Sequence, residues 1–212
     1  MPENKIKIVL VDTNCFIRLF HSSAKPIFGM DIGGYRLLTL ECLIDEYLES
    51  PTLIAKFPWI AQEPRLSELK NAKLKLKSPN KAATQNQIKV LKPYTKILLE
   101  SHCNKQGIEV KSLSKGDIEL LATSVAINCI MATDEWPLRL AAKHLMEDPA
   151  EYSIGLLHSI ELLHMLEING KIDAEQRKIT VDAWVRNKEK LLRDWKDEYQ
   201  MLFNESADGL GM

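Results

Sequence analysis

The chain has 212 residues, of which 45% are hydrophobic, and a formal net charge of −1. This length predicts one substantial core, with room for a helical extension. No apolar run approaches the roughly 18–20 residues that span a bilayer, and the charged first residues lack a signal-peptide pattern, so we expect a soluble, cytoplasmic protein with no membrane partner. The charge balance excludes a protein that coats nucleic acid through a global basic excess. Any contact with nucleic acid must therefore be local.

The cysteines and histidines do not form a recognisable zinc site. The four cysteines lie apart, without a Cys-x-x-Cys pair or a companion histidine at zinc spacing: Cys15, Cys42, Cys103 and Cys129. His158 and His164 lie on a mostly apolar segment without partners at metal spacing. We expect the cysteines to be reduced packing residues and the two histidines to be packing or surface residues.

The first part of the chain alternates between strand and helix patterns. Residues 6–11 read Ile-Lys-Ile-Val-Leu-Val, an apolar and β-branched run that predicts a buried parallel strand with Asp12 at its carboxyl end. Residues 35–40 follow the turn-forming Gly33-Gly34 and predict a second strand. Residues 41–49 then have a helix-forming composition.

Residues 64–100 have a helical pattern that is interrupted at Ser78-Pro79-Asn80 and can bend at Pro93. Three lysines of this segment are spaced to share one helix face: Lys70, Lys73 and Lys77. This is the most basic part of the chain, and we treat these lysines as candidate nucleic-acid contacts. A lysine-rich exposed helix face is, however, ordinarily only solubilising.

The middle of the chain predicts two further strands and two helices. Residues 108–113 predict a third strand, and Ser114 opens a helix with an apolar stripe that reaches about residue 126. Residues 129–132 predict a fourth strand, and a helix follows over about 137–146. This alternation predicts an α/β fold with three α/β/α layers around a central parallel sheet.

The last third of the chain is predicted to be helical. Residues 154–168 predict an apolar helix that stops near Asn169-Gly170, and residues 173–203 predict one long helix. We therefore expect an α/β domain over 1–150, a helical extension over 151–203 packed on it, and a loose polar tail over 204–212.

Acidic residues recur where the predicted strands end, which is the edge where open parallel sheets place their ligand sites. They are Asp12, Asp117, Asp134 and Glu135, with Glu41, Asp45 and Glu46 on the helix after the second strand. Carboxylates about 5 Å apart repel by roughly 3 kcal/mol per pair at an effective dielectric near 20. A divalent cation removes this repulsion, and oxygen-only ligands suit Mg²⁺ or Mn²⁺. Such a site favours metal-assisted hydrolysis of phosphodiesters.

Four ordered segments carry a resemblance to a known family: Val11-Asp12-Thr13-Asn14, Thr39 to Glu46, Leu113-Ser114-Lys115-Gly116-Asp117 and Ala132-Thr133-Asp134-Glu135. In order and spacing they resemble the acidic motifs of PIN-domain nucleases, over about residues 6–145. The resemblance implies a PIN-like fold for the first domain and four metal ligands: Asp12, Glu46, Asp117 and Asp134. It also implies that Thr13, Asn14 and Thr133 orient ligands or water. Many relatives have a second Asp where this chain has Glu135, so the choice between Asp134 and Glu135 stays open.

The C-terminal helices, near Gly155 and Gly170, resemble the extension of some prokaryotic PIN proteins of toxin-antitoxin pairs. This implies a metal-dependent endoribonuclease acting as a toxin, with RNA as substrate and an antitoxin protein as partner. Two alternatives stay open: a structure-specific DNA nuclease, and a catalytically silent PIN-like module that binds protein. The sequence also leaves open whether the chain forms homo-oligomers.

Several candidate residues also have a structural interpretation. Ser114-x-x-Asp117 matches a helix-capping box, and Asp12 can cap a turn with its polar neighbours. Glu41 in a first helical turn can simply answer the helix dipole. Arg139, one turn beyond the acids at 134 and 135, can reach a phosphate in a bidentate manner or pair with a neighbouring carboxylate.

Overall fold

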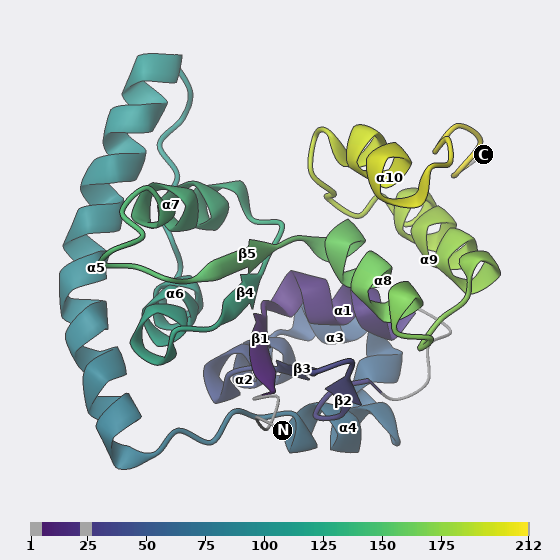
Figure 1. Ribbon diagram of the computed structural model, residues 1–212, viewed down its shortest axis with the longest axis horizontal. Helices are drawn as coiled ribbons and strands as arrows, with labels where there is room; N and C mark the ends of the chain where they lie inside the picture. Colours follow the sequence, from purple (N-terminus) through teal and green to yellow (C-terminus); the bar gives the residue numbers. More distant parts are fainter. Residues whose placement is uncertain (1–5, 22–26, 212) are drawn as a thin grey trace.

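A computed structural model describes residues 6–21 and 27–211. The fold is α/β, as predicted, with a mostly parallel five-stranded sheet between layers of helices (Figure 1). The strands are β1 (Lys7–Val11), β2 (Asp31–Ile32), β3 (Tyr35–Leu38), β4 (Ile130–Ala132) and β5 (Gly155–Leu157). The helices in the described residues are α1 (Thr13–His21), α2 (Glu41–Glu49), α3 (Pro51–Lys56), α4 (Arg65–Asn71), α5 (Ser78–Gln106), α6 (Lys115–Ile127), α7 (Trp136–Met146), α8 (Ser159–Ile168), α9 (Ala174–Arg186) and α10 (Trp195–Phe203), with a 3₁₀ turn at Pro58–Ala61.

The central strand β1 is parallel to both of its neighbours, so the carboxyl ends of these strands lie at the same edge of the sheet. The strand order is β2-β3-β1-β4-β5, and only β2 runs antiparallel to its neighbour. The apolar residues of β1 are buried on both faces of the sheet, which explains its uninterrupted apolar run. Val11 pairs with Ala132 in parallel register, and the Asp12 amide donates to the Ala132 carbonyl at 3.0 Å. Asp12 and Thr133 therefore leave the sheet side by side.

Two groups of helices cover the two faces of the sheet. Helices α5, α6 and α7 pack together on one face, and α1, α8 and α9 pack together on the other (Figure 1). Helix α10 packs on α8. The Trp184 indole of α9 is fully buried and donates to the Arg18 carbonyl of α1 at 3.0 Å. The C-terminal helices are therefore part of the same packed layer as α1.

The predicted third strand, residues 108–113, is wrong. Helix α5 continues to Gln106 and ends at Gly107, which adopts a left-handed conformation with φ of 65°. The segment after it is largely exposed, including Ile108 and Val110, and pairs with no strand. Its apolar residues resemble a strand in sequence, but the segment has no strand partner in the structure.

The remaining parallel strand is β5, which the sequence analysis assigned to a helix over 154–168. Gly155 allows β5 to lie close to β4, because a Cβ at this position would come within 2.9 Å of Ile130 Cγ1. The helical part begins only at Ser159, after His158 caps it by accepting from the Glu161 amide. Both strand and helix are apolar here, so composition alone does not separate them.

The predicted long helix over 173–203 is also wrong, because it divides into α9 and α10. Helix α9 ends at Arg186, and Lys188 then turns the chain with a positive φ of 54°. Residues 187–194 form the connection, which we call the α9–α10 linker. The tail after α10 packs against α9: Ala207 is buried and the Gly211 amide donates to Asp182 Oδ1 at 2.7 Å.

The three lysines predicted to share one helix face do not do so. Lys70 lies in the last turn of α4, Lys73 forms a bridge with Thr39 beside the sheet, and Lys77 precedes α5. The segment 72–77 is not helical. Helical spacing therefore does not apply between Lys70 and Lys77, and these lysines share no helix face. Helix α5 begins at Ser78, where the sequence predicts an interruption of the helical pattern. Pro93 lies within this helix. No helix of residues 6–21 and 27–211 is both long and apolar enough to cross a bilayer.

Candidate active site at the carboxyl ends of the strands

Asp12 is a buried carboxylate at the end of the central strand. Its exposed fraction is 3%, and Thr133 Oγ1 donates to its Oδ2 at 2.9 Å. Burial, together with the negative charges of Asp117 and Glu135 and against the Thr133 hydrogen bond, raises the pKa of Asp12 from 3.8 to about 7. Asp12 therefore lies near two other acids, and no basic side chain is among the groups that shift its pKa.

Asp117 combines a structural role with a place beside Asp12. Its Oδ2 accepts from the Ser114 amide at 2.8 Å, and Ser114 Oγ accepts from the Asp117 amide at 3.0 Å. This is the capping box that the sequence predicts at the start of α6. The same box fixes the carboxylate near Asp12, since the charge of Asp117 raises the pKa of both Asp12 and Glu135.

Asp134 does not join these acids. Its Oδ1 accepts from the Ser159 amide at 3.1 Å, and its Oδ2 accepts from Ser159 Oγ and forms an ion pair with Arg18 Nη1. The Asp134 side chain is 4% exposed. Both of its oxygens are occupied by partners within the chain, which favours Glu135 over Asp134 as the fourth acid.

Glu135 is the acid of this pair that faces Asp12 and Asp117. Its Oε1 accepts from Asn14 Nδ2 at 2.7 Å, and its amide donates to Thr133 Oγ1 at 3.1 Å. Glu135 is exposed as a residue, but the surrounding protein partly desolvates its carboxylate and so raises its pKa. The charge of Asp117 raises the Glu135 pKa further, whereas Arg18 and Lys190 lower it. We call Asp12, Asp117 and Glu135 the acidic cluster.

Glu46 lies next to the acidic cluster. Thr13 Oγ1 donates to Glu46 Oε2 at 3.1 Å. A Cβ added to Gly116 would lie 3.7 Å from the same oxygen, so Glu46 reaches the start of α6 beside Asp117. Glu41 is not part of this group, because it pairs with Lys73 at 2.6 Å, and this lysine lowers the Glu41 pKa. The predicted site residues Thr13, Asn14 and Thr133 all contact acids at this edge.

The predicted phosphate ligands lie elsewhere. Arg139 Nη1 donates to the carbonyls of Thr133 and Leu157, each at 3.0 Å, and so ties the ends of β4 and β5 together. Lys73 pairs with Glu41, while Lys70 and Lys77 are exposed on other elements. None of these four residues lines the hollow beside the acidic cluster.

Sequence reasoning missed Arg18, which is 2% exposed within α1. Besides Asp134, its Nη1 donates to Ser159 Oγ at 3.2 Å, and its Nη2 donates to the Lys190 carbonyl at 2.7 Å. We call Arg18, Asp134 and Ser159 the Arg18 cluster. The available signal is that Arg18 is a charged residue within the apolar run Cys15-Phe16-Ile17-Arg18-Leu19-Phe20.

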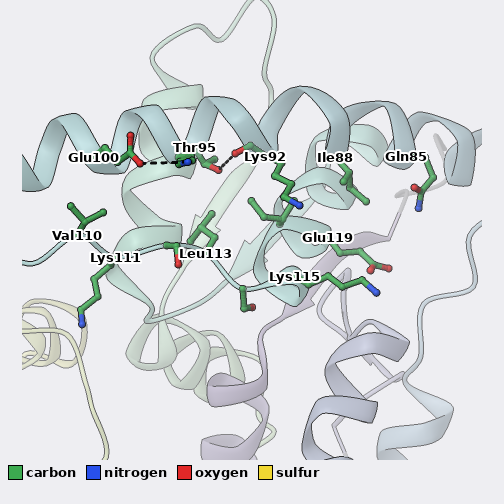
Figure 2. Close-up of a pocket in the computed structure, with 14 residues that line it drawn as sticks. Gln85, Ile88, Lys92, Thr95, Glu100, Val110, Lys111, Leu113, Lys115 and Glu119 are labelled. Atoms are coloured by element: carbon green, nitrogen blue, oxygen red, sulfur yellow. Dashed lines mark hydrogen bonds and ion pairs between the residues drawn. The ribbon is translucent and has the colours of Figure 1, made fainter.

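A hollow of about 810 Å³ opens beside the acidic cluster, and we call it the groove. Its lining includes Asn14, Glu135 and Trp136, residues 188–193 of the α9–α10 linker, and Arg18 and Asp134 of the Arg18 cluster. A second hollow, of about 690 Å³, lies between α5 and residues 110–119 (Figure 2). Its lining is mainly apolar and includes none of the acidic cluster.

The donor set of the acidic cluster fits a hard divalent cation. Its donor atoms are the oxygens of carboxylates that carry the same charge. Mg²⁺ is usually held by one or two carboxylates together with water. As the side chains stand, no three or more His, Cys, Asp or Glu residues of the described chain are grouped to hold a metal. The carboxylates hydrogen-bond to Thr133, Ser114 and Asn14 instead. The acidic cluster, as its side chains stand, is therefore not arranged around one point.

Comparisons of this chain with models of known protein families, with curated proteins and with solved structures find no match.

Proposed function

We propose that this chain is a metal-dependent nuclease that hydrolyses phosphodiester bonds of RNA at the acidic cluster. The observation that carries the proposal is Asp12, a carboxylate buried at the end of the central strand with its pKa raised to about 7 by burial, Asp117 and Glu135. Such an accumulation of like charge is unfavourable unless a cation is bound. Perturbed acids at the ligand edge of an α/β sheet are typical of functional sites.

Asp12, Asp117 and Glu135 would hold Mg²⁺ or Mn²⁺, with Glu46 close by. A cation in this place lowers the pKa of a bound water and shields the charge that develops on the phosphate. The other residues hold the ligands in position: Thr133 bonds to the carboxylate of Asp12 and the amide of Glu135, and Asn14 bonds to the carboxylate of Glu135.

The test is cleavage of labelled single-stranded and structured RNA by the purified chain with Mg²⁺, with Mn²⁺ and with EDTA. Removing a metal ligand costs electrostatic stabilisation of the transition state, so we expect Asp12→Asn to lower the rate by about 10³-fold. Glu175→Gln is the matched control, because Glu175 is exposed in the first turn of α9, does not line the groove and forms no ion pair within the described residues. Cleavage by Asp12→Asn at the wild-type rate would remove the proposal.

The same assay with DNA tests the alternative substrate. A cluster of acids does not distinguish a ribose 2′-hydroxyl, so the acidic cluster is equally compatible with a structure-specific DNA nuclease. RNA cleavage with intact single-stranded and branched DNA supports the endoribonuclease, and the opposite pattern supports the DNA nuclease.

The toxin role is the part of the proposal that comes from the resemblance of the C-terminal helices to prokaryotic PIN proteins. It predicts that expression of the chain arrests bacterial growth, that Asp12→Asn relieves the arrest, and that a small antitoxin protein relieves it by covering the acidic cluster. Unimpaired growth during expression of folded wild-type chain contradicts the toxin role and leaves the nuclease proposal standing.

A catalytically silent, protein-binding module is the second candidate. It is favoured by the finding that no three candidate ligands of the described chain are grouped around one point. It predicts no heat of binding for Mg²⁺ or Mn²⁺ at millimolar concentration, whereas the nuclease predicts binding in this range.

A further inference from the structure

The groove beside the acidic cluster has a basic wall that the C-terminal part of the chain supplies. Three cations of the α9–α10 linker line it: Lys188, Lys190 and Arg193. All three are exposed, and none of them forms an ion pair within residues 6–21 and 27–211. The other basic side chains of the groove that reach solvent, Lys56 and Lys111, pair with Glu189 and Glu109. The linker therefore presents unpaired positive charge to the groove.

The linker is held in place beside the acids. Arg18 Nη2 donates to the Lys190 carbonyl at 2.7 Å, and the Glu189 amide donates to the Trp184 carbonyl at 2.9 Å. Arg18 is itself fixed by its ion pair with buried Asp134. The side chain of Lys190 is near enough to Glu135 for its charge to lower the Glu135 pKa. The positive wall and Glu135 of the acidic cluster thus line the same groove.

An exposed aromatic ring also lines the groove. Trp136 directly follows Glu135, lines the groove and is 38% exposed. Its ring is 5.9 Å from the His102 ring, which supports it from α5. Trp136 lies at the first position of α7 and keeps part of its indole in solvent. An exposed aromatic beside free cations is the combination that binds single-stranded nucleic acid.

We propose that the groove binds a single-stranded polynucleotide, with its phosphates on Lys188, Lys190 and Arg193 and one base stacked on Trp136. This inference rests on the proposed function for the identity of the ligand, and it assigns to the α9–α10 linker the task of placing the strand at the acidic cluster. The C-terminal helices then belong to the substrate site. The shared ligand chemistry is the phosphodiester backbone with its bases, so RNA and DNA oligomers are both tested.

The first experiment measures binding without cleavage. A short labelled oligo(U) RNA and the matching oligo(dT) are titrated in EDTA against wild type and against a variant with Lys188→Gln, Lys190→Gln and Arg193→Gln. Each phosphate contact to a single strand contributes roughly 0.7 to the slope of log K against log salt, so we expect the slope to fall by about 2 and binding at low salt to weaken by about tenfold or more.

The matched control removes the same charge outside the groove, through Lys89→Gln, Lys143→Gln and Lys171→Gln. None of these lysines lines the groove or forms an ion pair within the described ranges. We expect the control to bind like wild type. Equal weakening in the two triple variants would show that only net charge matters and would overturn the proposal.

The second experiment tests the stacking residue. Trp136→Ala is expected to weaken oligo(U) binding by about 5- to 100-fold, and Trp136→Phe to restore most of it, because any aromatic face can stack on a base. Oligonucleotide binding should also quench tryptophan fluorescence in wild type more than in Trp136→Phe. Unchanged binding by Trp136→Ala, or unchanged quenching in Trp136→Phe, would contradict the stacking role. Since Trp136→Phe keeps a ring at this position, a folding defect does not obscure the result.

The outcomes separate this proposal from the nuclease proposal. Retained binding in EDTA without any hydrolysis in metal removes the nuclease and keeps the groove. Hydrolysis at the wild-type rate and KM by the linker triple variant removes the groove and keeps the nuclease. If the groove acts as proposed, the triple variant raises KM by about tenfold with a smaller change in kcat, because it loses contacts made equally in the ground and transition states.

Discussion

Asp134 and Glu135 are consecutive acids at the end of β4, yet they lie in opposite environments. Asp134 is buried against Arg18 and Ser159, so its charge is compensated inside the protein. Glu135 lies near Asp12 and Asp117 instead, where the charge of Asp117 raises the pKa of both Asp12 and Glu135. Asp134 also raises the Glu135 pKa, while Arg18 and Lys190 lower it. The Arg18 cluster is therefore complete in the folded chain, whereas the acidic cluster has no such internal counter-charge on Asp12, which is why we propose a cation there. The difference shows that the role of each acid in a motif depends on the partners of its carboxylate, and not on how many acids the motif contains.

The largest effect is expected from breaking the Arg18 cluster. Arg18→Met leaves Asp134 as a buried charge without a partner, so we expect a loss of about 3–5 kcal/mol in the free energy of unfolding. Replacing both partners, with Arg18→Met and Asp134→Leu, is expected to recover most of the loss, because no unpaired charge remains. Urea denaturation of the two variants measures this. Similar stability of the single variant and wild type would contradict the assigned role of Arg18.

The acidic cluster is expected to respond in the opposite direction. The pKa of Asp12 is raised from 3.8 to about 7, so this group binds a proton in the folded chain that the unfolded chain releases. Its contribution to stability is therefore lost as the pH rises from about 4 to about 7, by a few kcal/mol without metal. Asp12→Asn removes this loss.

In EDTA at about pH 8, we therefore expect Asp12→Asn to be more stable than wild type, with the difference disappearing at about pH 4. Added Mg²⁺ should stabilise wild type at the higher pH and leave the variant unchanged. Denaturant unfolding at the two pH values measures both effects. A variant that is less stable than wild type at both pH values would contradict the assignment of Asp12 as an uncompensated buried acid.

A smaller effect distinguishes the two consecutive acids directly. Glu135→Gln is expected to lower RNA hydrolysis by about 10- to 100-fold, with a change in stability within about 0.5 kcal/mol, because the residue is exposed. Asp134→Asn should do the reverse, lowering stability while the activity per folded molecule is retained. Kinetics and unfolding of both variants are compared, and loss of hydrolysis in folded Asp134→Asn would show that Asp134 acts in the site.

Much of this arrangement is predictable from the sequence, where local patterns determine it. The apolar run of β1 ending at Asp12 and the capping box at Ser114 and Asp117 are read correctly because each depends on neighbouring residues. The choice between Asp134 and Glu135 depends on Arg18, 116 positions away from Asp134, and no local pattern contains that contact.

The errors have the same origin. Strand β5 and helix α8 form one apolar stretch, and only the free edge of β4 determines where pairing ends and the helix begins. The linker between α9 and α10 interrupts a helical pattern because Lys188 turns the chain and Arg18 binds the Lys190 carbonyl. The basic wall of the groove therefore could not be predicted from the sequence. The lysines at 70, 73 and 77 suggested a shared basic surface, but they lie on different parts of the fold.

Binding of Mn²⁺ to the metal-free chain, measured by electron paramagnetic resonance, tests most directly whether the acidic cluster is a cation site. Wild type is expected to bind one Mn²⁺ ion at sub-millimolar to millimolar concentration, Mg²⁺ is expected to compete, and Asp12→Asn is expected to lose the site while Asp134→Leu with Arg18→Met retains it. Absence of binding to wild type, or equal binding to wild type and Asp12→Asn, would contradict the central claim that these acids are assembled to share a cation.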